Sequence, residues 1–211
     1  MSASSETIPG FSDRSQAPIA DIPTESEEFL RWAVSLDRHH PFKYELSRGK
    51  VSRRMINVSR AHWRVTANIL GELLQKLDRT RFEPGPAEFG VRTGVGVRYP
   101  DVIVDRASDG LEDLACEAPI FIVEVLSPST AGLDFTAKLQ ECTAIASVQT
   151  YLICSQDQPR AWVWARSDDG SWPGLPVELA GREGVVALRG LGVELTMAAI
   201  FRGIPDAPTV E

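Results

Sequence analysis

Apolar residues recur along this chain at two spacings, and the two spacings predict a mixture of helices and strands. A recurrence every three to four residues predicts helices over 26–37, 60–77, 134–147 and 196–201. Runs rich in β-branched and aromatic residues predict a hairpin over 42–56. By the same signal, strands are expected over 87–92, 97–105, 120–126, 150–155 and 160–167, with one or two more between 185 and 195.

The order of these elements predicts the fold class. Helix, hairpin, helix, strands, helix and strands indicate an α/β fold with a mixed central β-sheet flanked by helices. The length of 211 residues suits a single domain with a sizeable core. We expect this domain over 24–205, between a flexible N-terminal tail over 1–23 and a C-terminal tail over 206–211.

Composition narrows the class of protein. Apolar residues make up 43% of the chain and charged residues 24%, as in ordinary globular proteins. No apolar run approaches the roughly 20 residues of a membrane helix, and the N-terminus lacks the apolar segment of a secretory signal. The 3 cysteines are widely spaced and form no CxxC pair. We therefore expect a reduced cytoplasmic protein without membrane contact.

Charge is distributed unevenly along the chain. The formal net charge of −7 argues against a protein that coats nucleic acid through long-range attraction. Residues 46–71 nevertheless contain only basic charges: Arg48, Lys50, Arg53, Arg54, Arg60 and Arg64. This segment predicts either a local basic surface or, as is more common, a solvated hairpin and helix face.

Two carboxylates stand in unusual places. Glu124 lies inside the apolar run IFIVEVLSPST, residues 120–130, where a buried carboxylate must be paired, protonated or bound to a metal. The alternatives are a solvent-facing position or an ion pair with an arginine. Asp101 begins the strand of YPDVIVD, directly after Pro100. If the two strands are neighbours, their carboxylates form an oxygen-ligand site suited to magnesium or manganese.

A lysine follows on the next predicted helix. Lys138 comes four residues after Asp134, so both lie on one helical face. Near the carboxyl end of the strand with Glu124, this lysine would position an attacking water and offset charge on a phosphate. Taken alone, the pair is more often an exposed salt bridge, and Asp134 is more often a helix N-cap. Similarly, His62 near a helix start more often packs or caps.

Together, these residues resemble the motif of a known superfamily. Asp101, Glu124 and Lys138, with PDVIVD and IVEVLSPST around them, resemble the PD-(D/E)XK nucleases. Within that superfamily they are most similar to the small Uma-type restriction endonuclease family. The resemblance covers roughly residues 40–202. The segments that carry it include YELSRGK at 44–50, His62, DFTAK at 134–138 and SVQTYLICS at 147–155.

The resemblance implies a restriction-endonuclease-like core and a site. Asp101 and Glu124 would be ligands of a divalent cation, Mg or Mn, and Lys138 would be the catalytic lysine. Glu45 would be an accessory carboxylate near the metal, and Asp134 would support the lysine or its loop. The implied reaction is metal-assisted hydrolysis of a nucleic-acid phosphodiester bond, with DNA the expected substrate and a homodimer the common assembly.

The chain also departs from the family pattern. Leu126 stands where the superfamily places its lysine, Cys142 where the family often has tyrosine, and Arg48 in a turn that is usually Asp-Gly. One alternative is therefore a catalytically inactive module of the same fold that binds nucleic acid or a protein partner, which the acidic net charge favours. Another is an enzyme that acts on a different phosphate ester. No segment identifies the residues that would contact nucleic acid.

Overall fold

A computed structural model of the chain describes residues 22–36, 42–55, 58–86, 88–126 and 133–206. The predicted tails lie almost wholly outside the described residues. The helices are α1 (Ser26–Ser35), α2 (Arg60–Lys76), α3 (Leu133–Thr143) and α4 (Met197–Ile200). None of these described helices is long and apolar enough to cross a membrane.

The strands form one six-stranded, one five-stranded and one two-stranded sheet. The six-stranded sheet has the order β11 (Val177–Ala180), β10 (Arg160–Ala165), β9 (Thr150–Ser155), β8 (Phe121–Leu126), β6 (Val102–Arg106) and β3 (Phe82–Pro86). The five-stranded sheet has the order β2 (Lys50–Met55), β1 (Phe42–Ser47), β5 (Gly96–Arg98), β4 (Gly90–Thr93) and β7 (Ala115–Cys116). The remaining pair is β12 (Val185–Leu188) with β13 (Val193–Thr196).

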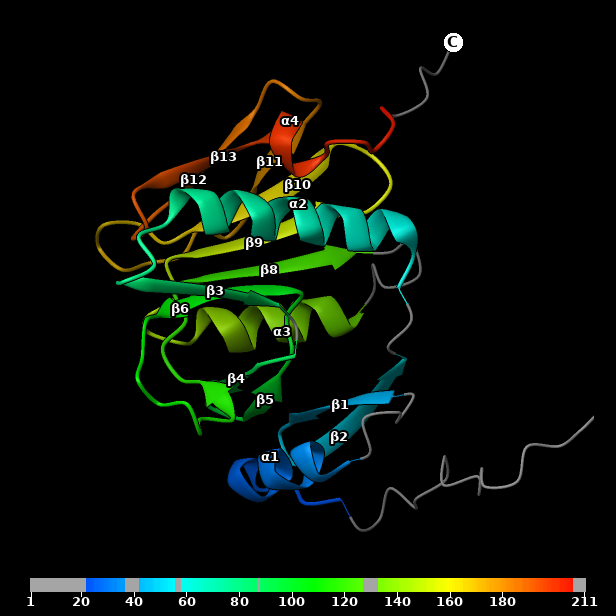
Figure 1. The fold of residues 1–211 in the computed structure, drawn as a ribbon, viewed down its shortest axis with the longest axis vertical. Coiled ribbons are helices and arrows are strands. Elements are labelled where there is room, and N and C mark those ends of the chain that lie inside the picture. The colour runs from blue at the N-terminus through cyan, green and yellow to red at the C-terminus, as the bar shows by residue number, and fades with distance from the viewer. Residues whose placement is uncertain (1–21, 37–41, 56–57, 87, 127–132, 207–211) are drawn as a thin grey trace, which may run out of the picture.

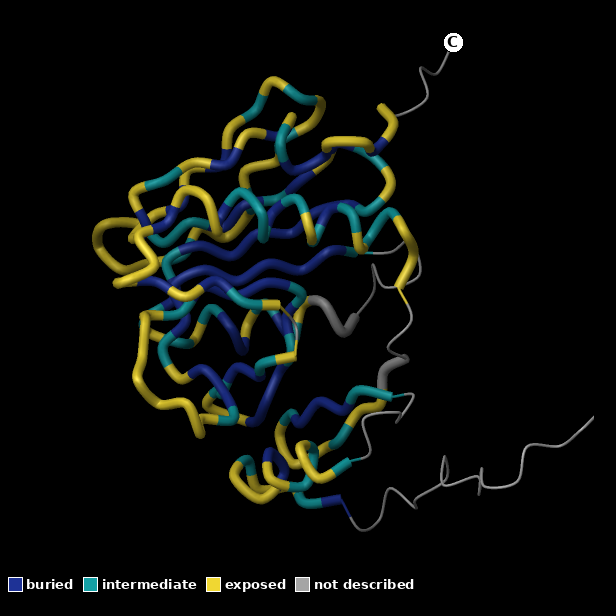
Figure 2. The backbone as a smooth tube through the Cα atoms, viewed as in Figure 1, coloured by how far each residue is buried: buried dark blue, intermediate teal, exposed yellow. Residues whose placement is uncertain are grey.

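The six-stranded sheet is the centre of the molecule. Its strands β8 and β9 are parallel and its other pairs are antiparallel, so the sheet is mixed as expected. Helices α2 and α4 and the β12–β13 pair cover one face, and α3 covers the other (Figure 1). Strands β8 and β9 are buried along almost their whole length (Figure 2). The predicted α/β class with helices on both faces is confirmed.

The five-stranded sheet differs on its two faces. Side chains alternate along a strand, and Tyr44, Leu46 and Val97 pack with α1 in an apolar cluster. Glu45 and Arg98, at the intervening positions, lie on the opposite face, toward α3. One face of this sheet is therefore an apolar core, and the other carries the charged Glu45 and Arg98 beside the buried apolar Val91 of β4.

One predicted strand is wrong, because residues 97–105 are divided between two sheets. Strand β5 ends at Arg98 in the five-stranded sheet, and β6 begins at Val102 in the six-stranded sheet. Pro100 lies between them and has no N–H to donate to a ladder, so a continuous strand is disfavoured there. The prediction also missed β3, β7 and β11, and α3 ends at Thr143 rather than at residue 147.

The β1–β2 turn determines the register of the hairpin. Arg48 and Gly49 have φ values of 50° and 70°, which is the left-handed pair that a two-residue type I′ turn requires. With this turn, Ser47 lies opposite Lys50 and Glu45 lies opposite Ser52. The turn thus decides which hairpin residues share a face with Glu45.

Candidate active site

Asp101 and Glu124 are neighbours on adjacent strands, as the sequence predicts. In the antiparallel β6–β8 pair, Val102 lies opposite Val123. The N–H of Asp101 donates to the carbonyl oxygen of Val123 at 3.0 Å, so the ladder continues and places Asp101 beside Glu124. The Oδ2 atom of Asp101 accepts a hydrogen bond from the N–H of Val125 at 2.7 Å. Both carboxylates therefore lie at one end of the central sheet.

Lys138 joins the central sheet to the five-stranded sheet. Its Nζ atom lies 2.8 Å from Oε1 of Glu124 and 2.9 Å from Oε1 of Glu45. All three residues are buried, with exposed fractions of 5% for Lys138, 8% for Glu124 and 1% for Glu45. The interpretation of Lys138 as part of an exposed salt bridge is therefore wrong. The side chain of Asp134 lies outside the described residues.

Two further charged residues extend this cluster, and sequence reasoning missed both. Arg98 Nη1 lies 3.2 Å from Oε2 of Glu45, and Arg98 Nε lies 2.7 Å from Oε2 of Glu141. The hydroxyl of Ser47 donates to Oε1 of Glu141 at 2.6 Å. Glu141 comes three residues after Lys138, which is a same-face spacing on a helix. That spacing was the available signal for Glu141, whereas no comparable local pattern identifies Arg98.

His62 contacts the predicted metal ligand. Its backbone N–H donates to the hydroxyl of Ser59 at 3.1 Å, so the helix cap is Ser59 and not His62. Its ring, however, lies in the site, with Nε2 3.2 Å from Oδ2 of Asp101. The side chain of His62 is 12% exposed. Helix α2 thus contributes its first turn to the same end of the sheet.

Glu141 is a fully compensated buried carboxylate. Burial raises its pKa, but hydrogen bonds from Arg98 and Ser47, with the positive charges of Arg98 and Arg48, outweigh burial and leave the pKa lowered. The same contacts stabilise the charged form of Arg98. Burial lowers the pKa of Arg98, but the carboxylates of Glu141 and Glu45 outweigh burial and leave that pKa raised. This side of the cluster is stable in its charged form.

Glu124 has the opposite balance. Burial raises its pKa, and Lys138 opposes this effect. The negative charges of Asp101 and Glu45 add to burial, and the result is a pKa of about 7. The positive charge of Lys138 thus offsets only part of the effect of burial and of the neighbouring carboxylates on Glu124.

A divalent cation would supply the missing charge. The cluster brings together four carboxylates and two basic side chains: Asp101, Glu45, Glu124 and Glu141 with Lys138 and Arg98. In the described part of the chain, no three or more His, Cys, Asp and Glu residues are arranged to hold a metal. Magnesium, however, is commonly bound by one or two carboxylates, with waters and substrate phosphates as its other ligands. Asp101 and Glu124 fit that chemistry.

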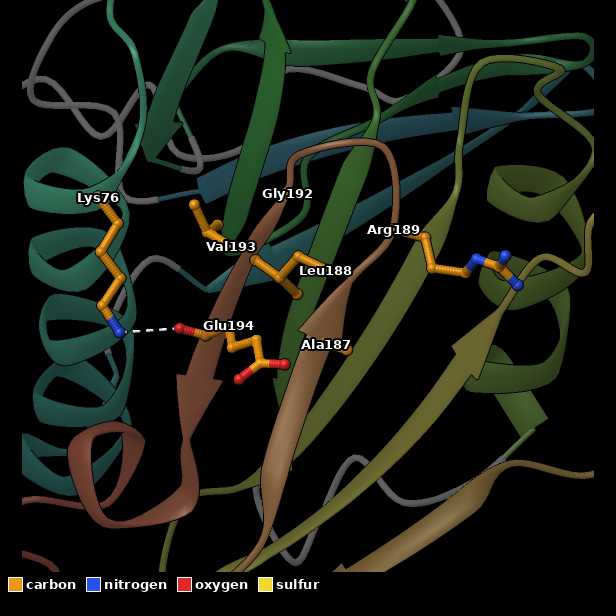
Figure 3. Close-up of a pocket in the computed structure, with 7 residues that line it drawn as sticks. All are labelled: Lys76, Ala187, Leu188, Arg189, Gly192, Val193 and Glu194. Atoms are coloured by element: carbon orange, nitrogen blue, oxygen red, sulfur yellow. Dashed lines mark hydrogen bonds between the residues drawn. The ribbon is translucent and has the colours of Figure 1, made fainter.

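A surface hollow lies elsewhere on the molecule. It has a volume of about 640 Å³ over β12 and β13 (Figure 3) and is lined by Lys76, Ala187, Leu188, Arg189, Gly192, Val193 and Glu194. The Lys76 ammonium donates to the carbonyl oxygen of Glu194. Lys76 lies roughly 21 Å along α2 from His62. None of the predicted site residues lines this hollow, so the charge cluster remains the candidate site.

Comparison with known proteins identifies the family. Residues 26–198 match the Uma2 family, described as "Putative restriction endonuclease", and the chain belongs to that family. The resemblance to Uma-type members of the PD-(D/E)XK superfamily is thus confirmed. Among curated proteins the chain is similar to the uncharacterized protein slr1290 of Synechocystis sp., with 26% identity over 196 residues, which cover 89% of this chain and 97% of that protein.

A solved structure shares the fold. It comes from Anabaena variabilis and is described as a putative nuclease belonging to DUF820. The TM-score is 0.64 at 15% sequence identity, and the match covers 82% of this chain and 96% of that chain. The restriction-endonuclease-like core predicted from the motif is therefore present, and the family is one of nuclease-like proteins.

Proposed function

We propose that this protein is an endonuclease that uses Mg²⁺ or Mn²⁺ to hydrolyse phosphodiester bonds of DNA. The carrying observation is the half-buried Asp101 next to the buried Glu124, whose carboxylate contacts the ammonium of Lys138. Membership in a family described as restriction endonucleases supports the same class of reaction.

Asp101 and Glu124 would hold the cation. When bound, the ion would lower the pKa of a coordinated water and offset negative charge on the phosphate. The N–H of Val125 and the ring of His62 both contact Oδ2 of Asp101, so they orient that carboxylate before a cation arrives. On Glu124, the contact with Lys138 is made through Oε1.

Lys138 would act on the water and the phosphate. Its ammonium is held between Glu45 and Glu124, so its position depends on both sheets. An ammonium fixed beside the metal-binding carboxylates can orient a water for attack and stabilise negative charge on phosphate oxygens. Glu45 is then a positioning residue for Lys138 on the side away from Glu124.

The first experiment is cleavage of supercoiled plasmid with Mg²⁺ or Mn²⁺. We expect the wild type to nick the plasmid, and Asp101→Asn and Lys138→Gln to lose at least about a hundredfold in rate. Glu178→Gln is the matched control, because Glu178 is also a strand glutamate paired with a cation, Arg160, but is exposed. Thermal unfolding would confirm that all variants remain folded.

Metal titration separates this proposal from its alternative. The alternative is an inactive module that binds nucleic acid or a protein, and the net charge of −7 favours it. We expect calorimetry to show Mg²⁺ or Mn²⁺ binding that Asp101→Asn abolishes. A wild type that neither cleaves plasmid nor binds either metal contradicts the proposal, and cleavage of RNA but not DNA contradicts its choice of substrate. Double-strand cleavage would also predict a homodimer, which light scattering would measure.

A further inference from the structure

Strand β2 borders the site on the five-stranded sheet. It is the last strand in the order of that sheet, and residues directly opposite each other on paired strands share a face. Ser52 lies opposite Glu45, and Lys50 lies opposite Ser47. Ser52 and Lys50 are therefore on the face that carries the site, whereas Arg53, opposite Tyr44, is on the face that packs with α1.

Burial changes abruptly between the two strands of the hairpin. On β1, Glu45 is 1% exposed beneath Lys138 of α3. On β2, Ser52, which lies opposite Glu45, and Lys50, which lies opposite Ser47, are both exposed. Paired strands lie only about 4.8 Å apart. The buried charge cluster thus meets solvent along β2.

The exposed charges of this hairpin are all positive. Among its described side chains, the single carboxylate is the buried Glu45, whereas Arg48, Lys50 and Arg53 are exposed. The ammonium of Lys43 lies 5.6 Å from the ring centre of Tyr99, two residues before Asp101. Of the exposed charges, that of Lys50 lies on the site-side face of β2, where a positive charge complements a polyanion although the net charge of the chain is −7.

We propose that the site-side face of β2, which we call the β2 ledge and define by Lys50 and Ser52, holds the phosphate backbone of the nucleic acid beside the catalytic cluster. The inference rests on the proposed function, because its occupant is the phosphodiester substrate. Lys50 supplies charge to phosphates, and the Ser52 hydroxyl and the backbone N–H groups of an edge strand supply hydrogen-bond donors. Such contacts position the substrate without reading its sequence.

The test measures binding of a fluorescein-labelled DNA duplex by fluorescence anisotropy. The buffer contains EDTA, and the salt concentration is varied from about 50 to about 200 mM. We expect Lys50→Gln to weaken binding about fivefold and to reduce the slope of log K against log salt by about 0.9. Ser52→Glu places a negative charge on the ledge and should weaken binding more than about tenfold. Arg53→Gln is the control. It removes one positive charge from the residue after Ser52, on the opposite face of the strand, and its affinity for DNA should stay within about twofold of that of the wild type.

Each outcome bears on the ledge separately from the nuclease activity. If Arg53→Gln weakens binding as much as Lys50→Gln, the attraction is not specific to one face and the proposal that the β2 ledge binds the phosphate backbone is wrong. If the wild type cleaves plasmid while Lys50→Gln and Ser52→Glu bind and cleave normally, the β2 ledge proposal is wrong and the nuclease proposal stands. If substitutions on the site-side face weaken binding and Arg53→Gln does not, but neither Mg²⁺ nor Mn²⁺ supports cleavage, the β2 ledge proposal stands and the nuclease proposal fails. If Ser52→Glu does not fold, the DNA affinity of Lys50→Gln alone tests the β2 ledge.

Discussion

The two sides of the buried charge cluster differ in how completely their charges are compensated. On the five-stranded sheet, Arg98 bridges Glu45 and Glu141, and the pKa of Glu141 is lowered. On the central sheet, Glu124 shares one ammonium with Glu45 and stands beside Asp101, and its pKa is raised. Two glutamates buried in the same cluster thus have pKa values shifted in opposite directions.

This is the difference that we expect between a structural ion network and a reactive site. A network that only held two sheets together would be stable when each buried charge had its partners. The Glu141 side meets that condition, because Arg98 and Ser47 both donate to its carboxylate. On the Asp101–Glu124 side, Lys138 offsets only part of the effect of burial and the pKa of Glu124 stays raised, and strongly perturbed groups are typical of functional sites.

The largest predicted effect removes the compensation on the five-stranded side. Arg98→Gln leaves Glu45 and Glu141 buried without their guanidinium, so we expect a loss of about 3–5 kcal/mol in the free energy of unfolding. Chemical denaturation measures this loss. The control is Arg160→Gln, which breaks an exposed pair with Glu178 and should cost less than about 1 kcal/mol. Equal losses in the two variants would mean that burial adds nothing to the Arg98 contacts.

A second change displaces the five-stranded side without altering a charge. A Cβ at Gly96 would overlap the carbonyl oxygen of Leu46 on β1, so Gly96→Ala must push β1 away from β5. We expect a loss of about 2–3 kcal/mol and slower plasmid cleavage, because Glu45 on β1 holds Lys138. Gly71→Ala on α2 is the control, since nothing lies within 4 Å of its added Cβ. Normal cleavage by Gly96→Ala would show that the position of Glu45 does not matter.

The third prediction tests the uncompensated side through pH. Folding raises the pKa of Glu124 from its ordinary value of 4.5 to about 7, so the folded state holds this proton more tightly than the unfolded state. The resulting stability is fully present below about pH 4.5 and is lost as pH rises through about 7. In EDTA at pH 8, we expect Glu124→Gln to be more stable than the wild type by on the order of 2 kcal/mol.

Metal addition sharpens the same experiment. Mg²⁺ should stabilise the wild type at pH 8 and leave Glu124→Gln nearly unchanged, because a ligand that binds only the folded state raises its stability. Thermal unfolding at several pH values, with and without Mg²⁺, measures both effects. A wild type and a variant with the same pH dependence would show that Glu124 titrates normally, and the comparison with Glu141 would then fail.

The smallest predicted effect concerns the hairpin turn. Arg48 adopts a φ of 50°, a left-handed conformation that asparagine tolerates better than arginine. Arg48→Asn should therefore raise the free energy of unfolding by about 0.5–1 kcal/mol. Because Arg48 also helps to lower the pKa of Glu141, the variant should raise that pKa slightly, which NMR titration of the carboxyl group would follow. Arg53→Asn on the adjoining strand should give no such gain.

Local patterns were sufficient to find part of the site. Asp101 follows a proline at a strand start, Glu124 interrupts an apolar strand, and Lys138 follows at helical spacing. Each signal spans only a few residues, because strand alternation and helical periodicity are local properties of the backbone. Sequential strands also often pair, which explains why the adjacency of Asp101 and Glu124 was predictable.

The rest of the cluster depends on contacts between distant segments. Arg98 lies 43 residues from Glu141 and 53 residues from Glu45, and no local spacing links them. Because Arg98 was predicted within one long strand with Asp101, its place in a different sheet was also missed. The ring contact of His62 with Asp101 spans 39 residues, so the helix start, which favoured packing or capping, could not reveal it.

By itself, the sequence determined the α/β class and the family and predicted the three central residues of the candidate site, because these depend on short-range periodicity and on motifs of a few residues. Only the tertiary structure decided that the chain changes sheets at Pro100, that α3 joins Lys138 to Glu45, and that β2 stays exposed beside them. The tertiary structure also decided that the pKa of Glu124 is raised and that of Glu141 is lowered. The physical reason is that burial and charge compensation are set by which segments pack together, and these segments lie far apart along the chain.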